Sequence, residues 1–97
     1  MAEIKINVEG MRSAASDFNS KNDEWNSLVN QIWAYLQELD EMWDGDANEA
    51  FNALVEEDKP KFEALYQRMI EYKEAINKAA DHYETSEEEI KIVVTKR

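Results

Sequence analysis

Cysteine and histidine, two of the side chains that often carry catalysis, are scarce in this sequence of 97 residues. It contains no cysteine, which removes a thiol nucleophile, a thiolate metal site and disulfide bonds. Its one histidine, His82, falls at the border of an apolar helical stripe, and no serine or aspartate is spaced to work with it. We therefore predict a structural role for His82 and no catalytic residue, so the chain is not expected to be an enzyme.

One segment has part of a metal-ligand spacing. Asp44, Asp46 and Asn48 are placed like the first three ligands of a calcium-binding loop. That loop requires glycine at its sixth position and glutamate at its twelfth, where this sequence has Glu49 and Val55. We therefore expect neither a metal nor another cofactor.

The charge balance argues against two classes of partner. Acidic residues outnumber basic ones by 22 to 11, which gives a formal net charge of −11. Nucleic acids and anionic membrane surfaces are bound largely through Lys and Arg, so neither is an expected partner. No apolar run approaches the ~20 residues that span a bilayer, and the first residues lack the basic and apolar regions of a signal peptide. We expect no stable membrane insertion and no cleaved signal peptide.

Apolar residues recur every three or four positions along two long segments, from Met11 to Trp43 and from Ala47 to Tyr83. If Met11 is heptad position a, the apolar residues of the first segment fill positions a, d and e, which cover about 100° of a helix surface. Only two glycines and one proline interrupt the whole chain, which is few for a β or α/β domain. The pattern predicts an all-α chain of two long helices.

Local signals place the ends of these helices. Asn7 is suited to cap the first helix. Gly45 suits the left-handed position just past a helix end, and Asp46 with Glu49 forms an aspartate version of the capping box for the second helix. Because the connection is short, the two helices must run antiparallel.

These signals predict a single helical-hairpin domain over residues 1–97. The first helix is expected at about 8–43, the turn at 43–46 and the second helix at about 47–86, with a kink at Pro60. Residues 87–97 are expected to form a flexible tail.

A lone hairpin leaves much of both apolar stripes uncovered, and a small chain buries little surface unaided. Two hairpins packed symmetrically close a four-helix bundle and bury both stripes. We therefore predict a homodimer, with a heterodimer to a similar hairpin as the alternative. The residues predicted to form the core and dimer face are Phe18, Trp25, Leu28, Ile32, Leu36, Leu39, Phe51, Leu54, Phe62, Leu65, Met69, Tyr72 and Ile76.

The predicted turn carries a recognisable motif. Trp43-Asp44-Gly45 stands near the midpoint of a chain of about a hundred residues, between two helices, and Ala47 and Ala50-Phe51 follow it. This arrangement resembles the Trp-X-Gly (WXG) hundred-residue family of ESAT-like proteins, which type VII secretion systems export. Near the end of the second helix, Tyr83-Glu84-Thr85-Ser86-Glu87 is similar to that family's export signal, Tyr-x-x-x-Asp/Glu. The resemblance covers about residues 4–88.

The resemblance implies a hairpin dimer that is exported folded and recognised by a membrane-bound ATPase of the FtsK/SpoIIIE type. It also implies a composite signal, with Trp43 and Gly45 of one subunit near Tyr83 and Glu87 of the other. The protein would then be a secreted, non-enzymatic substrate, effector or co-secreted partner, cytoplasmic before export and extracellular after it. The alternative is a cytoplasmic four-helix dimer that acts as a chaperone or adaptor for another helical protein or toxin.

Each of these residues also has a structural interpretation. Trp43 and Tyr83 continue the apolar stripes and pack in either case. Gly45 is required by the turn. Glu87 lies in an acidic run where folding requires nothing of it, so it is the cleanest test of the export signal.

Overall fold

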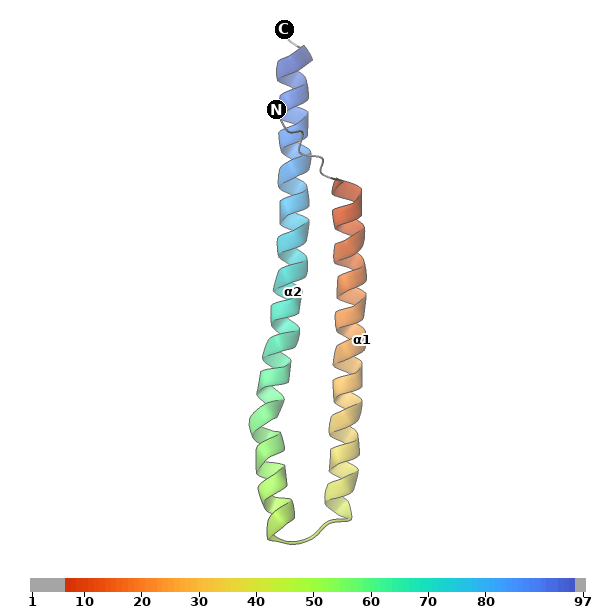
Figure 1. Cartoon of the computed structure of the whole chain (residues 1–97), viewed down its shortest axis with the longest axis vertical. Helices are drawn as coiled ribbons and strands as arrows, with labels where there is room; N and C mark the ends of the chain where they lie inside the picture. Colours follow the sequence, from red (N-terminus) through yellow and green to blue (C-terminus); the bar gives the residue numbers. More distant parts are fainter. Residues whose placement is uncertain (1–6, 96–97) are drawn as a thin grey trace.

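The computed structural model describes residues 7–95, with the side chains of residues 7–85, as two long helices. Helix α1 spans Val8–Glu41 and α2 spans Asp46–Thr95. They run antiparallel and are joined by one short turn at the lower end of Figure 1. The molecule is a rod of 80 × 20 × 18 Å. The predicted all-α hairpin is confirmed. Along the described residues, neither helix is long and apolar enough to cross a membrane.

The start of α1 follows from its cap. The side-chain oxygen Oδ1 of Asn7 accepts a hydrogen bond from the Gly10 amide at 2.8 Å, and the Asn7 carbonyl accepts one from the Met11 amide at 2.9 Å. A Cβ atom at Gly10 would lie 2.9 Å from Cγ of Asn7, so glycine leaves the space that this cap occupies. Glu9 adds a negative charge in the first turn, where the helix dipole favours it. The predicted cap at Asn7 is confirmed.

Helix α1 ends at Glu41, slightly before the predicted residue 43. The amides of Met42 and Trp43 donate to the carbonyls of Leu39 and Asp40 at 3.0 and 3.3 Å. These bonds reach back three residues, so the last turn of α1 tightens in the way that commonly ends a helix.

Gly45 begins α2. Its φ of 113° lies in the region that favours glycine. Its carbonyl accepts hydrogen bonds from the amides of Asn48 and Glu49 at 3.1 and 3.2 Å. A capping box requires the Glu49 amide to donate to the Asp46 side chain, but this amide donates to the Gly45 carbonyl. The predicted capping box of Asp46 and Glu49 is therefore wrong. The glycine backbone caps α2 instead.

Helix α2 continues through Pro60 as one element and curves along its length (Figure 1). It also continues to Thr95, past the predicted end at about residue 86. The tail predicted for residues 87–97 is therefore helical as far as Thr95, whereas residues 96–97 lie outside the described residues. Ser86 to Lys91 contains good helix formers and neither glycine nor proline, which favours continuation.

The line of contact between the helices, here called the seam, uses one heptad position of α1. Ala15, Asn22 and Val29 repeat every seven residues and are buried, and Leu36 and Trp43 continue the series half-buried. These are the predicted e positions. The fully buried side chains at the seam are alanines, so the hairpin buries little apolar volume by itself.

An aromatic cluster crosses the middle of the hairpin. The ring of Phe62 stacks on Trp25 at a centroid distance of 6.1 Å and meets Trp33 edge-on at 5.2 Å. Lys59 places its ammonium group 5.9 Å from the centre of the Trp33 ring. These contacts join α1 to α2 at the middle of the hairpin.

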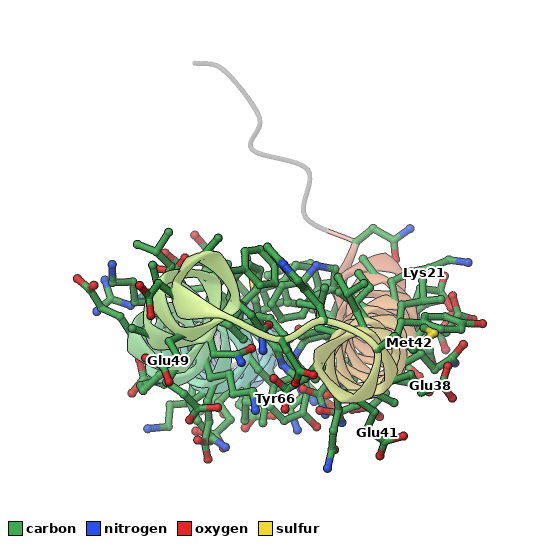
Figure 2. All side chains as sticks on the ribbon, turned by 90° about the horizontal axis from the view of Figure 1, so that it is seen from below. Lys21, Glu38, Glu41, Met42, Glu49 and Tyr66 are labelled. Atoms are coloured by element: carbon green, nitrogen blue, oxygen red, sulfur yellow. The ribbon has the colours of Figure 1, made fainter. Side chains whose placement is uncertain are left out.

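From Leu28 to Met42 the a and d positions of α1 are exposed and, with exposed apolar positions of α2, form an apolar face on one side of the two-helix layer. An apolar groove of about 230 Å³ lies on this side, lined by residues that include Phe18, Trp25, Leu65 and Met69. Lys21 also lines it, and Figure 2 shows Lys21 and Tyr66 on opposite sides of the layer. The large exposed members of the apolar face are Leu28, Ile32, Tyr35, Leu39 and Met42 of α1 and Leu54, Leu65, Tyr72 and Tyr83 of α2.

The predicted core and dimer face thus divides into two sets within one hairpin. Phe18, Trp25, Leu36, Phe51, Met69 and Ile76 are half-buried, whereas Leu28, Ile32, Leu39, Leu54, Phe62, Leu65 and Tyr72 are exposed. Burial of the exposed set by a second chain remains a prediction.

Candidate functional site at the two ends of the hairpin

The turn presents the residues of the Trp-X-Gly motif in different ways. Trp43 is half-buried, and its ring packs against Phe51 at a centroid distance of 5.6 Å and an angle of 40°. Asp44 and Gly45 are exposed. The tryptophan therefore closes the end of the seam while keeping part of its ring accessible.

A polar cluster spans the turn from α1 to α2. Nδ2 of Asn48 donates to Oδ1 of Asp40 at 2.7 Å, and Nδ2 of Asn52 donates to the same oxygen at 2.5 Å. Nδ2 of Asn52 also lies 3.3 Å from Oδ1 of Asn48. Asn48 is only 8% exposed. We call Asp40, Asn48 and Asn52 the turn clasp.

The turn clasp changes the acidity of Asp40. The hydrogen bonds from Asn48 and then Asn52 stabilise the carboxylate and lower the pKa of Asp40 below its ordinary value, while partial desolvation opposes them. The clasp is therefore strongest when Asp40 is ionised.

The open end of the hairpin carries the other predicted signal. Tyr83 is partly exposed, and its ring meets His82 edge-on at 5.8 Å. Nη2 of Arg12 lies 2.6 Å from Oδ1 of Asp81 and 2.8 Å from Oε2 of Glu84. These bonds, Asp81 first, raise the pKa of Arg12. They tie the first turns of α1 to the part of α2 that contains Tyr83.

The structure does not bring the two predicted signals together within one chain. Trp43 lies in the turn between α1 and α2, and Tyr83 lies in the part of α2 that is bonded to Arg12 near the start of α1. Figure 1 shows the start of α1 at the opposite end of the hairpin from the turn. Glu87 belongs to α2, but its side chain is outside the described side chains.

A third polar contact lies at the middle of the seam. Asn22 is 6% exposed, and its Nδ2 donates to the backbone carbonyl of Tyr66 at 3.2 Å. The Tyr66 hydroxyl donates to Oδ1 of Asp23 at 2.8 Å, and this bond raises the pKa of Tyr66. Figure 2 places Tyr66 between the two helices.

Sequence reasoning missed these polar contacts, although part of the signal was present. Asn22 occupies the same seven-residue series as Ala15 and Val29, so its register alone placed it at the seam. The partners of Asp40 and Arg12 required the register of α2 against α1, which spacing within one helix does not contain. In the described part of the chain, no three His, Asp or Glu side chains gather in a way that would hold a metal.

Comparison with known proteins agrees with this geometry. Residues 3–88 match the family described as proteins of 100 residues with WXG. The chain is similar to an ESAT-6-like protein of Streptococcus agalactiae, with 28% identity over 90 residues that cover 93% of this chain and 94% of that protein. It is also similar to the type VII secretion system extracellular protein A of Staphylococcus aureus strain USA300, with 23% identity covering 93% of each chain.

A solved structure has the same fold. The crystal structure of EsxA from Geobacillus thermodenitrificans superposes with a TM-score of 0.76 at 21% identity, covering 92% of this chain and 99% of that one. The family match spans nearly the whole hairpin and includes both the Trp43–Gly45 turn and Tyr83. This chain therefore belongs to the WXG family of ESAT-like proteins of about 100 residues.

Proposed function

We propose that this protein is exported by a type VII secretion system as a folded dimer, with Trp43 and Gly45 at the turn and Tyr83 and Glu87 near the end of α2 acting as its signal. It works as a non-enzymatic substrate, effector or co-secreted partner. Its recognition partner is a membrane-bound ATPase of the FtsK/SpoIIIE type. The family membership and the names of its relatives support this assignment.

The apolar face supports the dimer. Leu28, Ile32 and Tyr35 are each more than half exposed on α1, and Leu54 and Tyr72 are half exposed or more on α2. Exposed apolar side chains gathered along one side of a small protein usually mark an interface. A second copy placed on this face forms a four-helix bundle that covers both sets. The homodimer is the primary assignment, and a similar hairpin is the alternative occupant.

The observation that carries the proposal is the position of Trp43 and Tyr83 at opposite ends of a hairpin with one apolar face. Two such hairpins related by a two-fold axis, and packed antiparallel through that face, place the turn of one beside the open end of the other. A composite signal then exists in the dimer and is absent from a single chain. This arrangement would make export depend on dimerisation.

The test is the partition of the protein between cells and medium in its native host. We expect the wild type to reach the medium and Glu87→Ala to stay inside while remaining dimeric. Glu88→Ala is the matched control, because it removes the same charge from the next residue of the same helix. A cytosolic marker reports lysis.

The outcomes separate the two functional hypotheses. Export of the wild type and of Glu88→Ala, with retention of Glu87→Ala, supports the type VII signal. Equal export of all three contradicts a role for Glu87. Retention of all three with an intact dimer favours the cytoplasmic chaperone or adaptor and overturns the proposed function.

A further inference from the structure

The turn clasp surrounds the Trp-X-Gly motif without belonging to it. Asp40 precedes Trp43 by three residues, and Asn48 follows Gly45 by three. Each makes one backbone bond to the motif: the carbonyl of Asp40 accepts from the Trp43 amide at 3.3 Å, and the amide of Asn48 donates to the Gly45 carbonyl at 3.1 Å. The side chains of Asp40 and Asn48 then bond to each other at 2.7 Å.

These bonds form a closed ring around the turn. The motif is held at its tryptophan by Asp40 and at its glycine by Asn48, and the bond between the two side chains joins the end of α1 to the start of α2. Asn52 adds a second donor to the same carboxylate oxygen from the next turn of α2. The turn is therefore fixed from both helices, although its own residues are largely exposed.

The residue types suit this task. A carboxylate accepts two amide donors at one oxygen, and hydrogen bonds to a charged group are stronger than neutral ones. The Asn48 amide is nearly buried, so removal of Asp40 would leave it without this partner in a desolvated place. Fixing the first turns of α2 also fixes Phe51, against which the Trp43 ring packs.

We propose that Asp40, Asn48 and Asn52 are positioning residues for the Trp-X-Gly turn, and that the clasp sets the orientation in which Trp43 is presented. This inference rests on the proposed export function for its biological meaning. Its structural part, that the clasp orients Trp43, is measurable without any export.

The structural test uses the indole N–H resonance of Trp43 in ¹⁵N-labelled protein, assigned by its loss in Trp43→Phe, together with hydrogen exchange of the Asn48 and Glu49 amides. Asp40→Ala should shift the Trp43 resonance and leave those of Trp25 and Trp33 in place. Exchange at the two amides should rise about tenfold, as the loss of one charged hydrogen bond predicts. Glu41→Ala, which removes the neighbouring exposed carboxylate, should match the wild type.

A reciprocal exchange provides the decisive control. In Asp40→Asn/Asn48→Asp, the carboxylate moves to α2, and the amide at position 40 becomes its donor. Nδ2 of Asn52 already lies 3.3 Å from the Asn48 oxygen, so the second donor is also in reach. We expect Asn48→Asp alone to disturb the turn most, because it places a second carboxylate against that of Asp40. The double variant should restore the Trp43 resonance and the exchange rates.

Each outcome decides the proposal. Wild-type spectra and exchange in Asp40→Ala would overturn it, and so would failure of the double variant to recover from the Asn48→Asp defect. If Asp40→Ala loses its helical circular dichroism, Asn52→Ala and the double variant carry the same test with smaller perturbations. Recovery in the double variant is not expected from a role in general helix stability.

Export then separates this inference from the function on which it rests. Retention of the wild type would refute the proposed function, whereas the spectroscopic result would still decide the positioning role. If the wild type and Glu41→Ala are exported and Asp40→Ala is retained as a dimer, the clasp is required for presentation of the turn. Export of Asp40→Ala at the wild-type level would overturn that requirement.

Discussion

At the scale of single residues, the seam is specified by polar groups as much as by apolar ones. Asn22 is buried between two helices, where its amide bonds to the carbonyl of Tyr66. A buried amide contributes little net stability, but it disfavours alignments in which it loses its partner. The hydroxyl of Tyr66 on α2 donates to Asp23, the residue next to Asn22 on α1, so a second bond joins the helices at the same point. The middle of the hairpin therefore has one preferred register.

The buried amide of Asn22 predicts an unusual response to Asn22→Leu. The substitution replaces a buried polar side chain with an apolar one of similar size, so the free energy of unfolding should stay within about 1 kcal/mol of the wild type or increase. The register should become less specific, giving mixed oligomers in light scattering coupled to size-exclusion chromatography. Asn30→Leu, at an exposed position of α1, is the control and should leave the oligomer uniform. A strong loss of stability with one uniform oligomer would contradict the specificity role.

Asp40 gives a pH dependence of defined sign. Its pKa in the folded hairpin is lowered, chiefly by the hydrogen bond from Asn48. The stabilisation is therefore fully present above the ordinary carboxyl value of about 3.9 and is lost as the pH falls through the lower folded pKa. Thermal midpoints measured from about pH 6 down to about pH 3 should fall more steeply for the wild type than for Asp40→Asn. Glu41→Gln should follow the wild type, and equal slopes for wild type and Asp40→Asn would refute the assignment.

At the scale of elements, the sequence was most informative where the signal is local. The cap at Asn7, the helix period and the short turn were predictable because each depends on residues a few positions apart. The cap of α2 was not predictable from the sequence, because both Asp46 and Gly45 can cap a helix. In the structure the Gly45 carbonyl accepts the hydrogen bonds from the first amides of α2. The a, d and e stripe was correct as a whole, but only packing against α2 divides it into a seam and an exposed face. The turn clasp was not predictable for the same reason.

The open end of the hairpin depends on a contact between elements that neither helix specifies alone. Arg12 bonds to Asp81 and Glu84 in the region where Tyr83 is presented. Arg12→Ala should increase hydrogen exchange of the amides from Asp81 to Glu84. The effect on global stability should be small, because all three side chains are substantially exposed. Arg68→Ala removes an exposed charge from the middle of α2 and should leave that exchange unchanged. Unaltered exchange in Arg12→Ala would show that the ion pairs do not hold this end.

At the scale of the whole molecule, the hairpin is a layer with two unlike sides. On the side of the apolar face lies the groove lined by Phe18, Trp25, Leu65 and Met69. Along the other side, two grooves are lined mainly by amide and charged side chains, with Trp33 and Lys59 shared between them. A polar groove is satisfied by water, whereas an apolar face is covered favourably only by another apolar surface. This difference between the two sides predicts that a second hairpin packs on the apolar face.

The same charge added to each side of the hairpin distinguishes the side that packs against a second chain from the side that does not. Ile32 is 51% exposed in the single hairpin, so Ile32→Glu should cost the isolated chain little. In the four-helix dimer each of the two glutamates would be buried without a partner, at a cost of about 3 kcal/mol each, which corresponds to a dimer about 10⁴-fold weaker. Asn30→Glu adds the same charge two residues away, where it lines a polar groove, and should leave the dimer intact. Sedimentation equilibrium measures the dimer dissociation constants of both variants. A monomeric wild type at micromolar concentration would show that the chain has no dimer partner of its own kind. Dissociation by Asn30→Glu with an intact Ile32→Glu dimer would show that the partner packs on the opposite side of the hairpin.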